Sequence, residues 1–209
     1  MKSIYLDNFI AGYELELLHS LIGVTLTNFD FEMVHCVQYN PNLNSFEVAW
    51  PGTITLVSHS SMEHIIDIEF GGQVSLDQIE SERVNFKIKK SKTDYSKGRG
   101  IMFSWFKVKK VELFSNNIID LLDDTTFDIS IINFVKAQNC TELEYKYNGD
   151  ELIVLSSTDN RRIMVQIFES MNGAVTLHFN EVHIDLILSN NYHTQSPTKK
   201  YVKRLELVK

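Results

Sequence analysis

The stretch Phe46–Phe70, FEVAWPGTITLVSHSSMEHIIDIEF, carries the clearest fold signal in the chain. Two β-rich runs within it, Thr53–Ser58 and Ile65–Phe70, flank a polar link. In the second run, apolar residues alternate with Asp67 and Glu69, which is typical of a strand with one buried face. The stretch therefore predicts a β-hairpin that contributes to the core.

Similar runs elsewhere predict a mainly β fold, at the margin of α+β, with about eight to ten antiparallel strands in a sandwich or open barrel. Two short helices are expected at Ile10–Ile22 and Asn117–Asp124, and one helical turn at Ser75–Glu82. The further strands are expected at Val24–Val37, Arg83–Lys90, Ile101–Phe114, Phe127–Val135, Thr141–Tyr147, Leu152–Ser156, Ile163–Phe168, Ala174–Leu188 and Tyr201–Val208.

Turns and one irregularity complete this prediction. Asn148-Gly149-Asp150, Ser157–Arg162 and Asn172-Gly173 are expected to connect strands, because Asn-Gly between β-rich runs is a strong hairpin signal. In Ile101–Phe114 the apolar residues change sides near Lys109-Lys110. A β-bulge at that point would restore the register.

The chain is expected to form a single β-rich domain over residues 1–209, or two related halves at 1–114 and 115–209. Leu152–Phe168 resembles the second part of the opening stretch, and each copy follows an expected helix. However, Ile68 then aligns with Gln166, so the apolar face is inverted between the copies. Two unrelated hairpins account for the pattern as well as a duplication does.

Charge is distributed unevenly along the chain, whose net charge is −7. Residues 87–110 hold nine basic residues against Asp94, a net charge of +8, which leaves −15 for the remainder. Lysines interleaved with aromatic rings are typical of surfaces that bind single-stranded nucleic acid, but the acidic remainder would repel a polyanion and argues against a nucleic-acid partner. Edge protection and pairing with the acidic remainder are the alternatives. The candidate contact residues are Lys87, Lys89, Lys107, Lys109 and Trp105.

The segment Glu181–Asp185 is the main candidate for chemistry. On a strand, Glu181, His183 and Asp185 would project from one face. A carboxylate that orients an imidazole suits acid–base catalysis or a divalent cation. A solvated strand face gives the same pattern, and no HExxH or paired-cysteine motif indicates a metal.

Acidic residues gather after the expected second helix, at Asp120, Asp123, Asp124 and Asp128. Each carboxylate at the negative end of a helix dipole destabilises the helix by about 0.3–1 kcal/mol. A cation or a basic partner would relieve this repulsion. A misplaced helix boundary would explain it equally.

The functional hypothesis is a non-catalytic binding protein, for example an immunity- or antitoxin-like inhibitor of a basic protein. A reduced, cytoplasmic location is expected, because neither a signal peptide nor a disulfide framework is indicated by the sequence. No cofactor and no membrane partner are implied. The alternative is an enzyme that binds a small ligand or a metal in a β-barrel-like cavity, with Glu181, His183 and Asp185 at its mouth.

Overall fold

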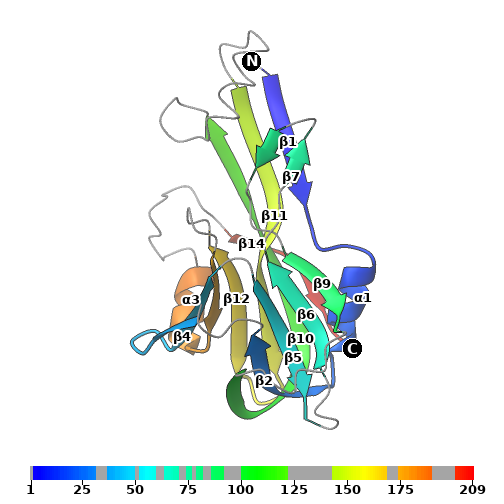
Figure 1. The fold of residues 1–209 in the computed structure, drawn as a ribbon, viewed down its shortest axis with the longest axis vertical. Helices are drawn as coiled ribbons and strands as arrows, with labels where there is room; N and C mark the ends of the chain where they lie inside the picture. The colour runs from blue at the N-terminus through cyan, green and yellow to red at the C-terminus, as the bar shows by residue number, and fades with distance from the viewer. Residues whose placement is uncertain are drawn as a thin grey trace.

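The computed structural model describes residues 2–31, 37–49, 52–59, 64–70, 74–76, 79–81, 86–91, 100–121, 143–168, 174–189 and 201–209. The two helices of these ranges are α1, Tyr13–Ser20, and α3, Glu181–Leu188 (Figure 1). Neither is long or apolar enough to cross a membrane. The strands are β1 Lys2–Asn8, β2 Thr25–Phe31, β3 Val37–Asn40, β4 Ser45–Ala49, β5 Gly52–Ser58, β6 His64–Phe70, β7 Val74–Leu76, β8 Ile79–Ser81, β9 Phe86–Lys90, β10 Gly100–Leu121, β11 Leu143–Ser157, β12 Arg162–Phe168, β13 Ala174–His178 and β14 Tyr201–Leu207.

Twelve of these strands form one open sheet, whose main path runs β3-β4-β13-β12-β11-β10-β2-β5-β6-β9. β14 pairs antiparallel with β10, and β1 pairs in parallel with β11. β7 and β8 pair with each other as a separate two-stranded sheet. The mainly β, antiparallel fold class predicted from the sequence is confirmed, with more strands than the eight to ten expected.

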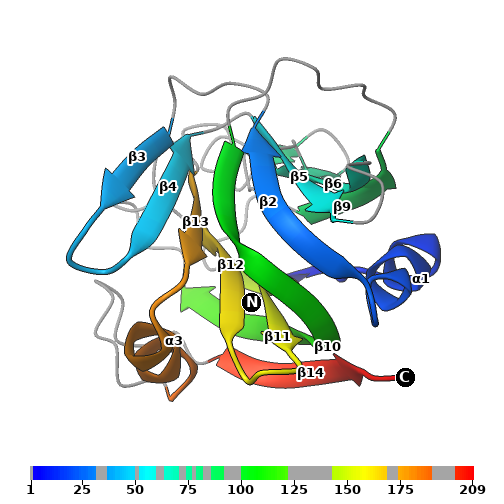
Figure 2. The same cartoon turned by 90° about the horizontal axis from the view of Figure 1, so that it is seen from below.

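Strand β10 joins two arms of this sheet. Its first part, Gly100–Lys107, pairs with β2 and so leads to the arm of β2, β5, β6 and β9. Its second part pairs with β11 and leads to the arm of β11, β12, β13, β4 and β3. Register shifts in both parts mark β-bulges, which bend and twist a strand, and β10 curves visibly along its length (Figure 2). The bulge predicted at Lys109-Lys110 is confirmed by the shift between Val108 and Lys110.

The main core is shared by both arms. Buried residues such as Leu56 and Ile68 of the first arm belong to one cluster with Val165 and Leu177 of the second. Leu18 of α1 joins this cluster, as a helix with one apolar face should. The sheet therefore curls so that one face of each arm is removed from water.

The hairpin of the opening stretch is confirmed by β5 and β6. Ile54 pairs with Ile68 and Leu56 with Ile66, and all four side chains are buried in the core. On the other face, Thr55 donates a hydrogen bond to Asp67 at 2.7 Å. Trp50 and Pro51 lie outside the described residues.

Two of the three local helices expected from the sequence are wrong. Asn117–Leu121 continues β10 and pairs with Glu144–Asn148 of β11, because a neighbouring strand satisfies its backbone and overrides the helix signal. The segment expected as one helical turn at Ser75–Glu82 contains β7 and β8 instead. Asp123 and Asp124 lie outside the described residues.

The turn expected at Asn148-Gly149-Asp150 is also wrong, because β11 runs straight through it. Asn148 pairs with Asn117, Asp150 with Ser115 and Leu152 with Phe114, which leaves Glu151 as the extra residue of a bulge. The Asn-Gly signal thus marks an irregularity within a strand.

Other expected features fall partly or wholly outside the described residues. Phe127–Val135 and Asn172-Gly173 belong there. β12 and β13 nevertheless pair as a hairpin would, with Phe168 opposite Ala174. The suggested boundary after residue 114 falls within β10, and the duplication itself stays a prediction.

Candidate functional site: the α3 pocket

Helix α3 replaces the second half of the strand predicted at Ala174–Leu188. β13 ends at His178, and the side chain of Asn180 accepts a hydrogen bond from the backbone N–H of His183 at 3.2 Å. Asparagine is a preferred N-cap residue. The negative charge of Glu181 in the first turn is stabilised by the positive end of the helix dipole. These local signals outweigh the β-branched composition that predicted a strand.

The row of Glu181, His183 and Asp185 is therefore not formed. On a helix, residues four apart such as Glu181 and Asp185 share a face, while His183, two residues from each, lies on a different face. Glu181 and Asp185 both bind Arg162, with Arg162 Nε 2.6 Å from Glu181 and Nη2 2.8 Å from Asp185. The two carboxylates thus join α3 to the start of β12 and are engaged in an ion pair.

The opposite side of α3 packs on the sheet. Ile184 and Ile187 join a second buried cluster with Leu152, Val154 and Met164. Alternate residues of β11 point to the main core, so both faces of this strand are buried. This double burial explains the continuous apolar run Leu152–Leu155.

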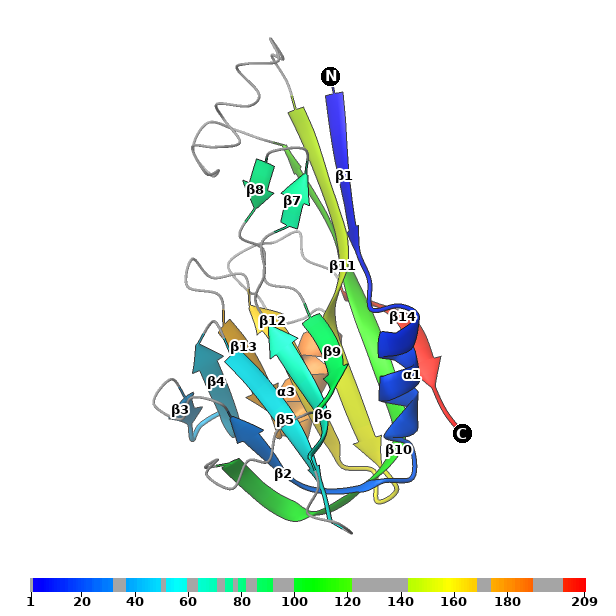
Figure 3. The ribbon, with the colours of Figure 1, turned by 45° about the vertical axis from the view of Figure 1, so that its right-hand side comes forward.

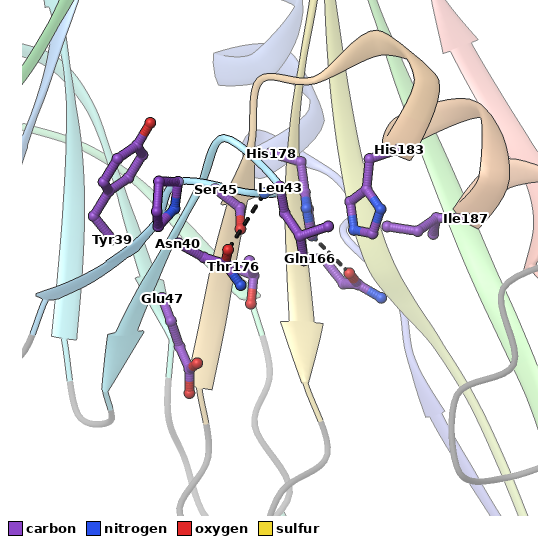
Figure 4. Close-up of a pocket in the computed structure, with 11 residues that line it drawn as sticks. Tyr39, Asn40, Leu43, Ser45, Glu47, Gln166, Thr176, His178, His183 and Ile187 are labelled. Atoms are coloured by element: carbon purple, nitrogen blue, oxygen red, sulfur yellow. Dashed lines mark hydrogen bonds between the residues drawn. The ribbon is translucent and has the colours of Figure 1, made fainter.

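A pocket of about 400 Å³ lies beside α3, and we call it the α3 pocket (Figure 4). Pairing across three strands builds its floor: Ser45 is opposite His178, Glu47 is opposite Thr176, and Thr176 is opposite Gln166. These residues alternate with Phe46, Leu177 and Val165, which belong to or pack on the core. His183 and Ile187 close one side of the pocket from α3, and the β3–β4 turn closes another.

His178 is one of the deeply buried polar groups of the α3 pocket, only 4% exposed. Gln166 donates its amide N–H to Tyr201 Oη at 3.1 Å, so its carbonyl oxygen faces His178 Nε2 at 2.8 Å. Since a carbonyl oxygen can only accept, Nε2 must carry the ring proton. His178 Nδ1 is then an acceptor, and it is buried without a hydrogen-bond partner among the described residues.

Burial, and secondarily the neighbouring His183, lowers the pKa of His178 to about 3. The two rings lie 4.9 Å apart between centroids. Burial also lowers the pKa of His183. His178 is therefore neutral at pH 7, and its free lone pair on Nδ1 persists across the physiological range.

The charge of the α3 pocket is negative. Among the described residues that line it, Glu47 is the one charged side chain, since no lysine or arginine is present and His178 is neutral. Glu47 is exposed. Its carboxylate and the Nδ1 lone pair of His178 are acceptors, which suits a ligand that donates hydrogen bonds.

The basic candidates from the sequence do not form one surface along the sheet. Lys87 and Lys89 are exposed on β9, at the end of the sheet path, whereas Lys107 and Lys109 are exposed on β10 with Trp105. β2, β5 and β6 separate β9 from β10 in the path. Of the acidic candidates, Asp120 lies in β10, and its side chain is outside the described ones.

Sequence reasoning found His183 of this pocket but missed His178, Gln166 and Glu47. These three come from separate strands, and only the pairing of β4, β13 and β12 brings them together. Within the described part of the chain, no three His, Cys, Asp or Glu side chains are grouped as a metal site. No protein-family model, curated protein or solved structure matches the chain.

Proposed function

We propose that the protein is a non-catalytic binding protein whose α3 pocket takes a small cation of the amine or guanidinium class. The observation that carries the proposal is the unpartnered His178 Nδ1, buried at the floor of a cavity large enough for a ligand. A buried acceptor without a partner costs about 1–3 kcal/mol. A ligand N–H that reaches Nδ1 would remove this cost.

The proposed ligand spans from His178 to Glu47. Ser45 lies opposite His178, and Glu47 follows two residues later on the same face of β4, so Glu47 is the diagonal neighbour of His178. Diagonal neighbours on paired strands are about 7–8 Å apart. A short amine or alkyl guanidine can therefore donate to Nδ1 at one point and place its charge beside the carboxylate at another.

Charge supports a cation over an anion. An anion would meet Glu47 and the lone pair of His178, and no described lining residue offers a compensating positive charge. His178 would also have to be protonated to attract an anion, and its pKa of about 3 opposes this at neutral pH.

Two hypotheses from the sequence bear on this proposal. Binding without catalysis is the class expected there, and a ligand cavity is part of the alternative. The basic protein partner stays a prediction. It was expected from the acidic character of the chain, and the side chains of its candidate contact residues Asp120, Asp123 and Asp124 lie outside the described ones.

Titration calorimetry of the full chain with propylamine, ethylenediamine and methylguanidine tests the proposal, with propanol, acetamide and acetate as neutral and anionic counterparts. We expect the cations alone to bind. Glu47→Gln should weaken binding by up to about 5-fold, because Glu47 is exposed and an exposed charge pair contributes little, and His178→Phe should weaken it by removing the acceptor. Glu16→Gln, an exposed carboxylate on α1, should leave the affinity unchanged.

Three outcomes would overturn the proposal. The first is no binding by any of the cations, and the second is equal affinity for acetate. The third is saturable Zn²⁺ binding without amine binding, which would make the histidine pair a metal site.

A further inference from the structure

The first part of β10 carries two large apolar side chains to the surface at a bulge. Met102 pairs with Asn28 and Phe106 with Leu26, so three residues of β10 lie opposite one residue of β2. Met102 is 84% exposed and Trp105 is 67% exposed. Tryptophan is rarely left so accessible, since it is among the largest apolar side chains. In Figure 3 this part of β10 curls along the lower end of the molecule.

Arg161 holds the bulge in place. Its Nη1 donates to the backbone oxygen of Ser104 at 3.1 Å and to its Oγ at 2.6 Å, and Nη2 donates to the backbone oxygen of Trp105. Asp159 forms an ion pair with the same guanidinium, with its Oδ2 at 2.8 Å from Arg161 Nε. The β11–β12 turn thus binds the backbone of the bulge.

The Trp105 ring is also supported. It packs on the His59 imidazole at 4.3 Å between centroids. The His59 backbone N–H donates to Thr25 at 2.8 Å, which anchors the end of β5 against β2. An aromatic ring that is exposed and already held in position loses little entropy when a partner covers it, and such rings often anchor interfaces.

The charge beside Trp105 is positive. Phe106 and Val108 point to the core, while Trp105, Lys107 and Lys109 are exposed on the outer side of the strand. Among the described residues, no ion pair is found for either lysine. The nearest acid of the adjoining turn, Asp159, is paired with Arg161.

We infer that this surface, formed by Met102, Trp105, Lys107, Lys109 and His59, docks a short acidic segment of another protein. The two lysines indicate an acidic partner, because charges of opposite sign attract across an interface. Its carboxylates would face the lysines while an apolar side chain covers Trp105. The size of the surface indicates whether the partner is a short segment or a second copy of the chain. Two large apolar side chains fall far short of the roughly 800 Å² per partner of a stable dimer, so a short segment fits better than a second copy.

A random peptide library displayed on phage and selected on the full-length protein tests the inference. We expect the recovered peptides to be rich in Asp and Glu around an aromatic or aliphatic residue. Synthetic versions should bind with an affinity that falls as salt rises. Trp105→Ala should weaken this binding about 10-fold or more, as loss of an anchor residue does.

The charge-reversal pair Lys107→Glu/Lys109→Glu supplies a second variant that leaves Trp105 in place, and it should weaken binding at least as much. Tyr13→Ala is the matched control, because Tyr13 is an exposed aromatic residue on α1 that is 60% accessible. Recovered peptides without an acidic bias would overturn the inference, and so would unchanged binding by both variants. Tighter binding of oligothymidine than of the acidic peptides would assign the surface to single-stranded nucleic acid instead.

Discussion

At the scale of single residues, His178 shows how a buried side chain can be held in one protonation state. Its Nε2–H donates a hydrogen bond to the Gln166 carbonyl oxygen, and the Gln166 amide N–H in turn donates to Tyr201 Oη. The main core lies behind β13, and α3 places a second neutral imidazole in front. Burial and the neighbouring His183 both disfavour a charged ring, so the neutral form is favoured.

This environment predicts an acid-sensitive stability. An unfolded histidine titrates near pH 6.5, whereas folded His178 has a pKa of about 3. Between these values the unfolded state binds a proton that the folded state does not. The free energy of unfolding therefore falls as pH decreases, by up to about 1.4 kcal/mol per pH unit from this residue.

Urea unfolding between about pH 4 and 6.5 measures this effect. His178→Gln should give a shallower pH dependence than the wild type, whatever its absolute stability. Val182→Ala, which alters an exposed residue of α3 that does not titrate, should keep the wild-type slope. Equal slopes for the wild type and His178→Gln would show that His178 titrates normally in the folded state.

At the scale of elements, helix α3 determines whether the pocket exists. It contributes His183 and Ile187, and its first turn depends on the Asn180 cap. Asn180→Ala should lower the free energy of unfolding by about 1 kcal/mol. The same change should weaken amine binding, because His183 donates its backbone N–H to this cap.

Asn180→Asp is the matched control, since aspartate caps helices as well as asparagine does. Chemical denaturation gives the stabilities of the three proteins, and calorimetry gives the affinities. If Asn180→Ala were as stable as Asn180→Asp, the cap would contribute nothing and the start of α3 would have another cause.

Elements with a regular pattern could be predicted from the sequence. The alternation in β6 and β9 identified their buried faces, and the change of sides in β10 located a bulge at Lys109. α3 could not be predicted this way, because its β-branched residues favour a strand and outweighed the N-cap signal of Asn180 in the sequence. The end of β10 was missed for a related reason: Ile118 and Ile119 fit either a helix or a strand, and the long-range pairing with β11 decides.

The candidate site was predictable only in part, for the same physical reason. His183 was identified as chemically interesting, but its neighbours Glu181 and Asp185 turned out to hold Arg162. His178 and Gln166 are 12 residues apart and meet because β12 and β13 pair. No local spacing in the sequence encodes such a contact.

At the scale of the whole molecule, Asp150 ties both ends of the described chain to the centre of the sheet. It lies in β11, is 2% exposed, and accepts a hydrogen bond from the Ile10 backbone N–H at 2.8 Å. Arg204 of β14 binds the same carboxylate with Nε at 2.8 Å and Nη2 at 2.5 Å, and also donates to the Ile10 carbonyl. The connection after β1 and the last strand thus share one buried anchor.

Asp150→Ala should destabilise the protein by up to about 3–5 kcal/mol, because it leaves Arg204 without its charge partner in a partly buried position. The double variant Asp150→Ala/Arg204→Met should recover part of that loss, since no unpaired charge remains. Lys203→Ala removes ion pairs with exposed Glu206 and buried Glu112. It should cost less, about 1 kcal/mol, because Lys203 itself is exposed and Lys110 still pairs with Glu112. A small effect of Asp150→Ala in urea unfolding would mean that the anchor is not formed.

The central claim is that a cation in the α3 pocket donates a hydrogen bond to His178 Nδ1. The most direct measurement is the side-chain ¹⁵N NMR spectrum of His178 at pH 7, before and during titration with the tightest-binding amine. We predict a neutral ring protonated on Nε2 in the free protein, and a shift of the Nδ1 resonance towards that of a hydrogen-bonded acceptor as the amine saturates. An Nδ1 resonance that stays unchanged while the amine binds would contradict the claim. A ring that carries protons on both nitrogens at pH 7 would contradict it too.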